Sequence, residues 1–136
     1  MTTADDVTYF EALSPEECRN LLATARVGRV AWLTDAGINV LPVNFHLTDG
    51  RIVFHTSATS ALSRLQQPTA VSFQTDDIDL DAAIGWSVLV RGTTSAAGDD
   101  HSASWAPDAS VGIAISTDWL AGRVVSGNRE PGRDKS

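Results

Sequence analysis

A cluster of hydroxyl side chains is the first feature of this chain that could do chemistry. His55, Thr56 and Ser57 end an alternating apolar segment, and Ser60 lies inside a short segment of helical character at Thr59–Gln67. Hydroxyl groups, free backbone N–H groups and the positive end of a helix dipole can together hold a phosphate group. Ser and Thr before a helix also serve as ordinary N-caps. The cluster therefore predicts either a phosphate site or a simple helix cap.

Other groupings of reactive side chains carry weaker signals. The three histidines, His46, His55 and His101, have no cysteine or carboxylate at the spacing of metal ligands. No nucleophile-elbow sequence marks a Ser-His-Asp triad. Cys18 lies on the apolar face of a predicted helix, which indicates a buried thiol, and the run Asp76–Asp81 lacks the pattern of a calcium loop. We therefore expect no metal site and name no catalytic residue.

These groups must be positioned by secondary structure, and the first predicted element is a short amphipathic helix. Ser14 suits the N-cap, Pro15 suits the first helical position, and Glu17 completes a capping box. Apolar residues then recur at helical spacing before Gly28, which is a natural stop. The sequence predicts a helix over residues 14–26.

Six segments that follow this helix have the texture of strands. They are joined mostly by turn-like sequences such as Asp35-Ala36-Gly37 and Thr48-Asp49-Gly50. Many antiparallel strands in a short chain favour a small β-barrel, and the pattern is not that of alternating βαβ units. The expected strands cover residues 27–34, 38–46, 51–56, 70–75, 85–95 and 111–116, with a short helix at 59–67.

Two irregular features break this pattern. Pro42 lies inside the second strand, where a proline requires an edge position, a bulge or a kink that faces a ligand. The acidic segment Asp76–Ala83 and the polar segment Gly98–Ala109, which contains His101 and Trp105, are predicted as loops.

Length and composition set the remaining bounds. The 136 residues predict one domain at 13–125, preceded by an extension at 1–12 and followed by a tail at 126–136 that we expect to be disordered. A net charge of −7 argues against nucleic acid and anionic membranes as partners. The single cysteine excludes an internal disulfide. The N-terminal residues do not have the pattern of a signal peptide, and no apolar run is long enough to cross a membrane, so we expect a cytoplasmic protein.

Several windows, taken in order, resemble the FMN-binding split-barrel family related to pyridoxamine 5′-phosphate oxidase, in its short bacterial branch. The resemblance covers roughly residues 13 to 123. The windows are Leu13–Cys18 with Leu21-Leu22, Val27–Ala31, Leu41–Phe45, Ile52–Thr56, Gly85–Gly92 and Leu120–Arg123.

The resemblance implies a six-stranded antiparallel split β-barrel that forms a homodimer, with one FMN in each of two clefts between the subunits. It places Leu41–Asn44 along the isoalloxazine ring, the hydroxyl cluster around the phosphate, and Trp86 and Ser87 against the flavin from the long strand, either of the same chain or of its partner. A core or dimer-interface aromatic is the alternative interpretation of Trp86. The cofactor-binding residues expected on this basis are Leu41, Pro42, Val43, Asn44, His55, Thr56, Ser57, Ser60, Ala61, Leu62, Arg64, Trp86 and Ser87.

The chain departs from the family pattern where the phosphate should be neutralised. Family members commonly carry Arg at the position of His55 and Lys at or near Ala61, while Arg64, one helical turn on, is placed to compensate. The loss of two charge-assisted contacts, at roughly 1.5–3 kcal/mol each, weakens binding by about a hundredfold or more. Weak FMN binding, a different flavin-like ligand and complete loss of the cofactor all stay open.

The sequence thus supports three functions. The first is an FMN-dependent oxidoreductase acting on an unknown small molecule, in which the flavin supplies the hydride chemistry. The second is a reductase that uses a deazaflavin coenzyme on the same fold. The third is a non-enzymatic dimeric protein with a degenerate flavin pocket.

Overall fold

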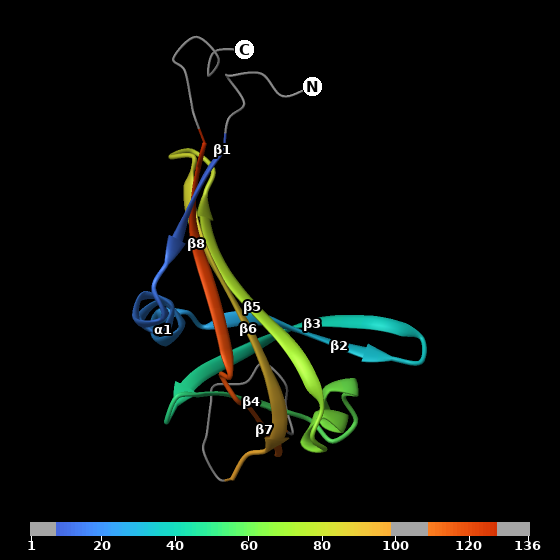
Figure 1. Ribbon diagram of the computed structural model, residues 1–136. Coiled ribbons are helices and arrows are strands. Elements are labelled where there is room, and N and C mark those ends of the chain that lie inside the picture. Colours follow the sequence, from blue (N-terminus) through green and yellow to red (C-terminus); the bar gives the residue numbers. More distant parts are fainter. Residues whose placement is uncertain (1–7, 99–108, 128–136) are drawn as a thin grey trace.

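The computed structural model describes residues 8–98 and 109–127, and these residues form one antiparallel sheet that closes into a barrel (Figure 1). The strands follow the order β1-β8-β6-β5-β2-β3-β4-β7, and a further pairing of β6 with β7 closes the sheet. Strands β2 to β7 therefore make the closed six-stranded barrel that the sequence predicted, and β8 and β1 extend it beyond β6. The elements are β1 (Thr8–Leu13), α1 (Pro15–Thr24), β2 (Val27–Thr34), β3 (Gly37–Thr48), β4 (Arg51–Thr56), the 3-10 helix η2 (Ala61–Gln66), β5 (Ala70–Asp79), β6 (Ile84–Ala96), β7 (Val111–Ile115) and β8 (Trp119–Gly127).

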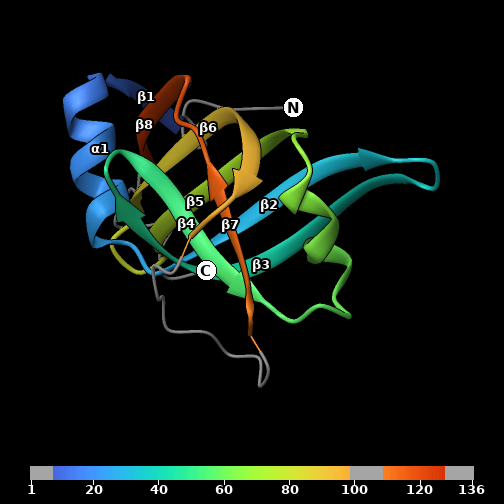
Figure 2. The same ribbon diagram turned by 90° about the horizontal axis from the view of Figure 1, so that it is seen from below.

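The predicted N-terminal helix is confirmed as α1, together with its capping box. The Glu17 N–H donates to Ser14 Oγ at 3.1 Å, and the Ser14 N–H donates to Glu17 Oε1 at 2.8 Å. The helix buries Cys18 and Leu22 against the barrel, beside β8, β3 and β6 (Figure 2). Its C-cap is Ala25, so Gly28 does not end the helix. Gly28 instead lies in β2, where a Cβ atom would collide with the Phe73 ring.

The barrel interior is filled by the inward-facing side chains of the strands. Phe45 and Phe73 meet edge to face with ring centroids 4.8 Å apart, and Phe54 is fully buried in the same core. Leu62 and Leu65 of η2 also belong to this core. Because η2 contributes these side chains and contacts β6 and β7, it packs the end of the barrel near the start of β5.

Two parts of the sequence prediction were wrong. The acidic segment was expected as a loop, but its first residues continue β5 as far as Asp79. Their side chains are exposed, and their backbone pairs with β6 as far as the pair Asp79–Ile84. The chain also has more than six strands, since β8 follows β7, and β1 occupies residues expected to form an extension. β8 was missed because its residues alternate weakly; pairing with the long strand β6 from Ile84 to Arg91 holds it in place.

Some predictions cannot be compared with the structure. His101 and Trp105 of the expected polar loop lie outside the described residues. Residues 1–7 and residues 128–136 of the expected tail also lie outside them.

Strands β2 and β3 continue past the barrel as a two-stranded hairpin, here called the arm (residues 32–41; Figures 1 and 2). The arm exists because β2 pairs with β5 only over Arg29–Ala31, whereas β3 pairs with β4 only from Phe45 onward. Leu33, Ile38 and Val40 are 74%, 70% and 55% exposed on it.

Pro42 lies where no described strand covers the second edge of β3. Of the three positions that the sequence allowed for this proline, it therefore occupies a strand edge. The Phe45 N–H donates to the Arg26 carbonyl at 2.9 Å, and antiparallel pairing alternates, so Arg29 and Pro42 form a non-hydrogen-bonded pair. The proline nitrogen therefore points away from β2, and no hydrogen bond between β2 and β3 is lost.

Candidate functional site

A cleft of about 720 Å³ separates η2 from the arm. Both views of the ribbon show η2 beside the arm (Figures 1 and 2). Among the described residues that line the cleft, Arg64 is the one cation and Asp35 the one carboxylate. The complete lining is Trp32, Leu33, Thr34, Asp35, Ala36, Asn39, Ala61, Arg64, Leu65, Gln67 and Thr69. The structure therefore brings two of the predicted site residues, Ala61 and Arg64, to a cavity large enough for a cofactor.

The hydroxyl cluster leads into η2 and is partly used by local structure. Ser60 Oγ accepts a hydrogen bond from the Leu62 N–H at 3.1 Å, so this serine is the N-cap of η2. Ser57 Oγ and Thr59 Oγ1 lie 3.2 Å apart. The Leu62 side chain points into the core and is 7% exposed. Ser60 therefore acts as a helix cap, which was the simpler of the two interpretations. The Ser57 and Thr59 side chains remain partly exposed next to the same turn.

His55 and Thr56 are directed away from this cleft. The Thr56 side chain is buried, 5% exposed, and His55 is on the opposite face of β4. A Cβ atom at Gly112 would lie 3.1 Å from His55 Nε2, so the imidazole packs over β7. Neither residue lines the cleft that contains Arg64. The alternation of side chains along β4 thus separates His55 from Thr56, and neither joins Arg64 in the cleft.

The predicted segment Leu41–Asn44 runs along β3 from the base of the arm into the barrel. Leu41 and Val43 turn their side chains toward the core, and Pro42 is exposed. Because Val30–Leu41 and Gly28–Val43 are the hydrogen-bonded pairs of this register, their backbone groups face β2. The backbone groups that face away from β2 belong to Ile38, Val40, Pro42 and Asn44, so within the predicted segment Pro42 and Asn44 carry the groups open to a ligand.

Trp86 and Ser87 lie at the opposite end of β6 from η2. They pair with Asp77 and Asp76, whereas Thr93, next to the η2 end of the barrel, pairs with Ala70. Six or seven strand residues span roughly 20 Å. The two residues therefore cannot line the cleft of their own chain.

The outer face of the sheet carries a chain of polar side chains that sequence reasoning missed. Arg29 Nη1 donates to Gln74 Oε1 at 3.2 Å and lies 3.9 Å from Asp76 Oδ2. Gln74 Nε2 donates to Asp76 Oδ2 at 2.7 Å and to Ser87 Oγ at 3.2 Å. Three different strands supply these groups, so only the strand register brings them together.

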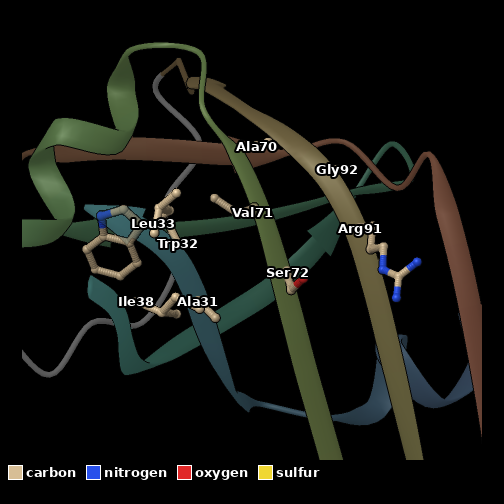
Figure 3. Close-up of a pocket in the computed structure, with 9 residues that line it drawn as sticks. All are labelled: Ala31, Trp32, Leu33, Ile38, Ala70, Val71, Ser72, Arg91 and Gly92. Atoms are coloured by element: carbon tan, nitrogen blue, oxygen red, sulfur yellow. The ribbon is translucent and has the colours of Figure 1, made fainter. Parts of the chain in front are cut away.

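A shallower groove of about 410 Å³ lies on the other side of the arm (Figure 3). Ala31, Leu33 and Ile38 form its apolar wall, and Figure 3 shows the Arg91 side chain directed away from them. The Arg91 guanidinium is stacked 4.3 Å from the centroid of Trp119 on β8. The continuous apolar run Val30–Leu33, which makes both faces of the strand apolar, was the available signal for this exposed apolar strip.

In the described part of the chain, neither Cys18 nor a cluster of metal-ligating side chains offers a second site. Burial, and then the charge of Glu17, raise the pKa of the Cys18 thiol, which makes it a poor nucleophile. Within residues 8–98 and 109–127, no three His, Cys, Asp or Glu side chains gather as a metal site would require. No helix in these ranges is long and apolar enough to cross a membrane.

Comparisons with known proteins show the family and the fold. Residues 14–130 match the protein family described as pyridoxamine 5′-phosphate oxidase. An uncharacterized protein of Mycobacterium tuberculosis is 33% identical over 92 residues, which are 64% of this chain and 60% of that protein. The match thus spans less than two thirds of that relative's length.

Solved structures resemble the whole described domain. The FAD binding protein from Mycobacterium smegmatis is 27% identical with a TM-score of 0.71, over 85% of this chain and 98% of that one. A FAD-binding protein from Mesorhizobium loti has a TM-score of 0.73 at 23% identity, over 88% of this chain and 99% of that one. The second likeness supports the fold.

Proposed function

The chain belongs to the pyridoxamine 5′-phosphate oxidase family, and from this premise we propose that it binds a flavin nucleotide in the cleft between η2 and the arm. The observation that carries the proposal is the cleft itself: about 720 Å³, with Arg64 on one wall and Trp32 and Asn39 on the other. Ligand pockets commonly measure roughly 300–1,000 Å³ and combine apolar walls with a few placed polar groups.

Arg64 is the residue we assign to the phosphate. It is the cation of the described cleft, and the hydroxyls of Ser57 and Thr59 lie in the turn that leads into the same short helix. An arginine presents donors to two phosphate oxygens at once, which compensates in part for Ala61 and for a His55 that packs elsewhere.

A second copy of the chain is needed to complete this site. Trp86 and Ser87, which the family resemblance assigns to the cofactor, lie too far along β6 to reach the cleft of their own chain. The exposed apolar residues Leu33, Ile38 and Val40 offer a surface that a partner would cover. We therefore assign the homodimer as the functional unit, with each cleft closed by the partner's β6.

The chemistry proposed is that of an oxidoreductase acting on a small molecule. The bound flavin supplies hydride transfer, and this chain's residues bind, orient and shield it from water. No histidine lines the described cleft, and Asp35 is its one carboxylate, so no side chain is assigned as a general acid or base. Cys18 is a buried free thiol, which suits the reducing cytoplasm where we place the protein.

FMN is the first candidate among the flavins. FAD is the second, because the Mycobacterium smegmatis structure that is 27% identical is described as a FAD binding protein. A deazaflavin coenzyme carries a longer anionic tail and fits the net charge of −7 less well. A non-enzymatic protein with a degenerate pocket is favoured only by the single cation of the described cleft.

The visible absorption spectrum of the purified protein tests the proposal, followed by titration with FMN and FAD. Flavin bands, or saturable binding of either nucleotide at micromolar concentration, are expected. A colourless protein that binds neither nucleotide contradicts the proposal and leaves the deazaflavin coenzyme as the next ligand to titrate.

A further inference from the structure

The amide orientation of Gln74 is fixed by its two charged neighbours. Arg29 can only donate hydrogen bonds, and the Asp76 carboxylate can only accept them. Gln74 Oε1 must therefore face Arg29, at 3.2 Å, and Nε2 must face Asp76, at 2.7 Å. The opposite orientation would place two donors together on one side and two acceptors together on the other.

This orientation determines what the Ser87 hydroxyl can do. Gln74 Nε2 has two N–H groups, and one is directed to Asp76 while the other reaches Ser87 Oγ at 3.2 Å. The serine oxygen thus accepts a hydrogen bond from Gln74. Its own proton is left to donate outward from the face of β6, where Ser87 is half-buried.

We propose that Gln74 is a positioning residue that makes Ser87 a hydrogen-bond donor toward an acceptor atom of the flavin bound by the partner subunit. This inference rests on the proposed function, since it requires a flavin and a second copy. It adds that the recognised group is an acceptor, such as a carbonyl oxygen of the flavin ring or an oxygen of its side chain. Ser87 Oγ keeps a second lone pair, so the arrangement supplies a donor toward the flavin without excluding a flavin N–H as a further contact.

The substitution Gln74→Glu tests the proposal, because the side chain keeps its shape and loses both donors. The introduced carboxylate can only accept from Ser87, so the hydroxyl proton turns inward and a lone pair faces the ligand. The dissociation constants of FMN and FAD, and the flavin absorption bands, are measured for wild type, Ser87→Ala, Gln74→Glu, the double variant and Ser87→Thr. Asn20→Asp, on the exposed face of α1, is the control for added negative charge.

The variants Ser87→Ala and Gln74→Glu should each weaken flavin binding about tenfold, as expected for one lost hydrogen bond. The double variant should be no weaker than Ser87→Ala, because both changes remove the same interaction. Ser87→Thr keeps the hydroxyl and should bind as the wild type does, with the same flavin bands.

The outcomes separate this inference from the function on which it rests. If the wild type binds no flavin, the proposed function fails and the inference fails with it. If the wild type binds flavin but Gln74→Glu binds equally well, only the inference is overturned. It is also overturned if Gln74→Glu still weakens binding in the Ser87→Ala background, since the added charge would then act directly on the ligand.

Discussion

Strands β2 and β3 run through both the barrel and the arm, yet their apolar side chains are buried in the barrel and exposed on the arm. Inside the barrel, Val30 and Phe45 are buried and the backbone of β2 and β3 is paired on both sides. Along the arm, Leu33 and Ile38 are more than two thirds exposed, and β3 has a free edge. Burial in the core of one chain explains why Val30 and Phe45 are apolar. It does not explain why Leu33 and Ile38 are apolar. The difference indicates that the arm's sequence serves an interaction with something outside the chain.

The largest expected effect lies inside the barrel. Phe73→Ala removes a fully buried ring that meets Phe45 edge to face and covers Gly28, so it should lower the free energy of unfolding by about 3–5 kcal/mol. Urea unfolding of the purified variant measures this loss. If the free energy of unfolding falls no more than for an ordinary surface substitution, packing in the barrel interior does not stabilise this protein as proposed.

The next effect lies where barrel and arm meet. Arg64→Ala should weaken FMN binding by about ten- to a hundredfold, because it removes the cation of the described cleft and its charge-assisted contacts. Fluorescence titration of the flavin measures the change. Arg91→Ala is the matched control, since Arg91 is stacked on Trp119 and points away from the arm. Equal losses in both variants would place the phosphate elsewhere.

A smaller effect should distinguish the arm from the rest of the surface. Ile38→Ala should weaken dimerisation by about tenfold, since roughly 1.5 kcal/mol of apolar burial is lost at the proposed contact. Its effect on a monomer's stability should be within about 0.5 kcal/mol, as for other exposed sites. Sedimentation velocity over a dilution series measures the association. Leu80→Ala, at an 83% exposed residue in the turn between β5 and β6, should leave the association unchanged.

The smallest expected effect is on the pH dependence of stability, through the capping box of α1, which packs against the barrel. The backbone N–H of Ser14, and then its hydroxyl, lower the pKa of Glu17 in the folded protein. A carboxyl whose folded pKa is depressed stabilises the fold above its unfolded pKa and loses this contribution as the pH falls through the folded value. Glu17→Gln should therefore flatten the slight loss of stability between neutral and acidic pH. Urea midpoints across that range measure it, and an unchanged slope would contradict the assignment.

The fold could be predicted because its signals are local. The capping box at Ser14 and Glu17, and the apolar segments separated by turn sequences up to residue 115, each follow from neighbouring residues. The strand β8 could not be predicted in the same way, because it is held in an extended conformation by pairing with β6, which lies much earlier in the chain.

The candidate site was predicted less completely, for a related reason. The sequence identified Ala61 and Arg64, which share the helix that forms one wall of the cleft. It did not identify Trp32 and Asn39, since the opposite wall is set by how far the arm projects from the barrel. It also predicted His55 and Thr56 at the phosphate; neither residue lines the cleft, and the His55 imidazole lies over Gly112.

Pro42 also limits aggregation through the free edge of β3. A free strand edge next to apolar side chains is a template for runaway strand addition and aggregation. The proline ring removes a backbone donor from that edge at the base of the arm, so a third strand cannot extend the ladder past this position. A newly made chain that has not yet met its partner is thereby protected from association along this edge.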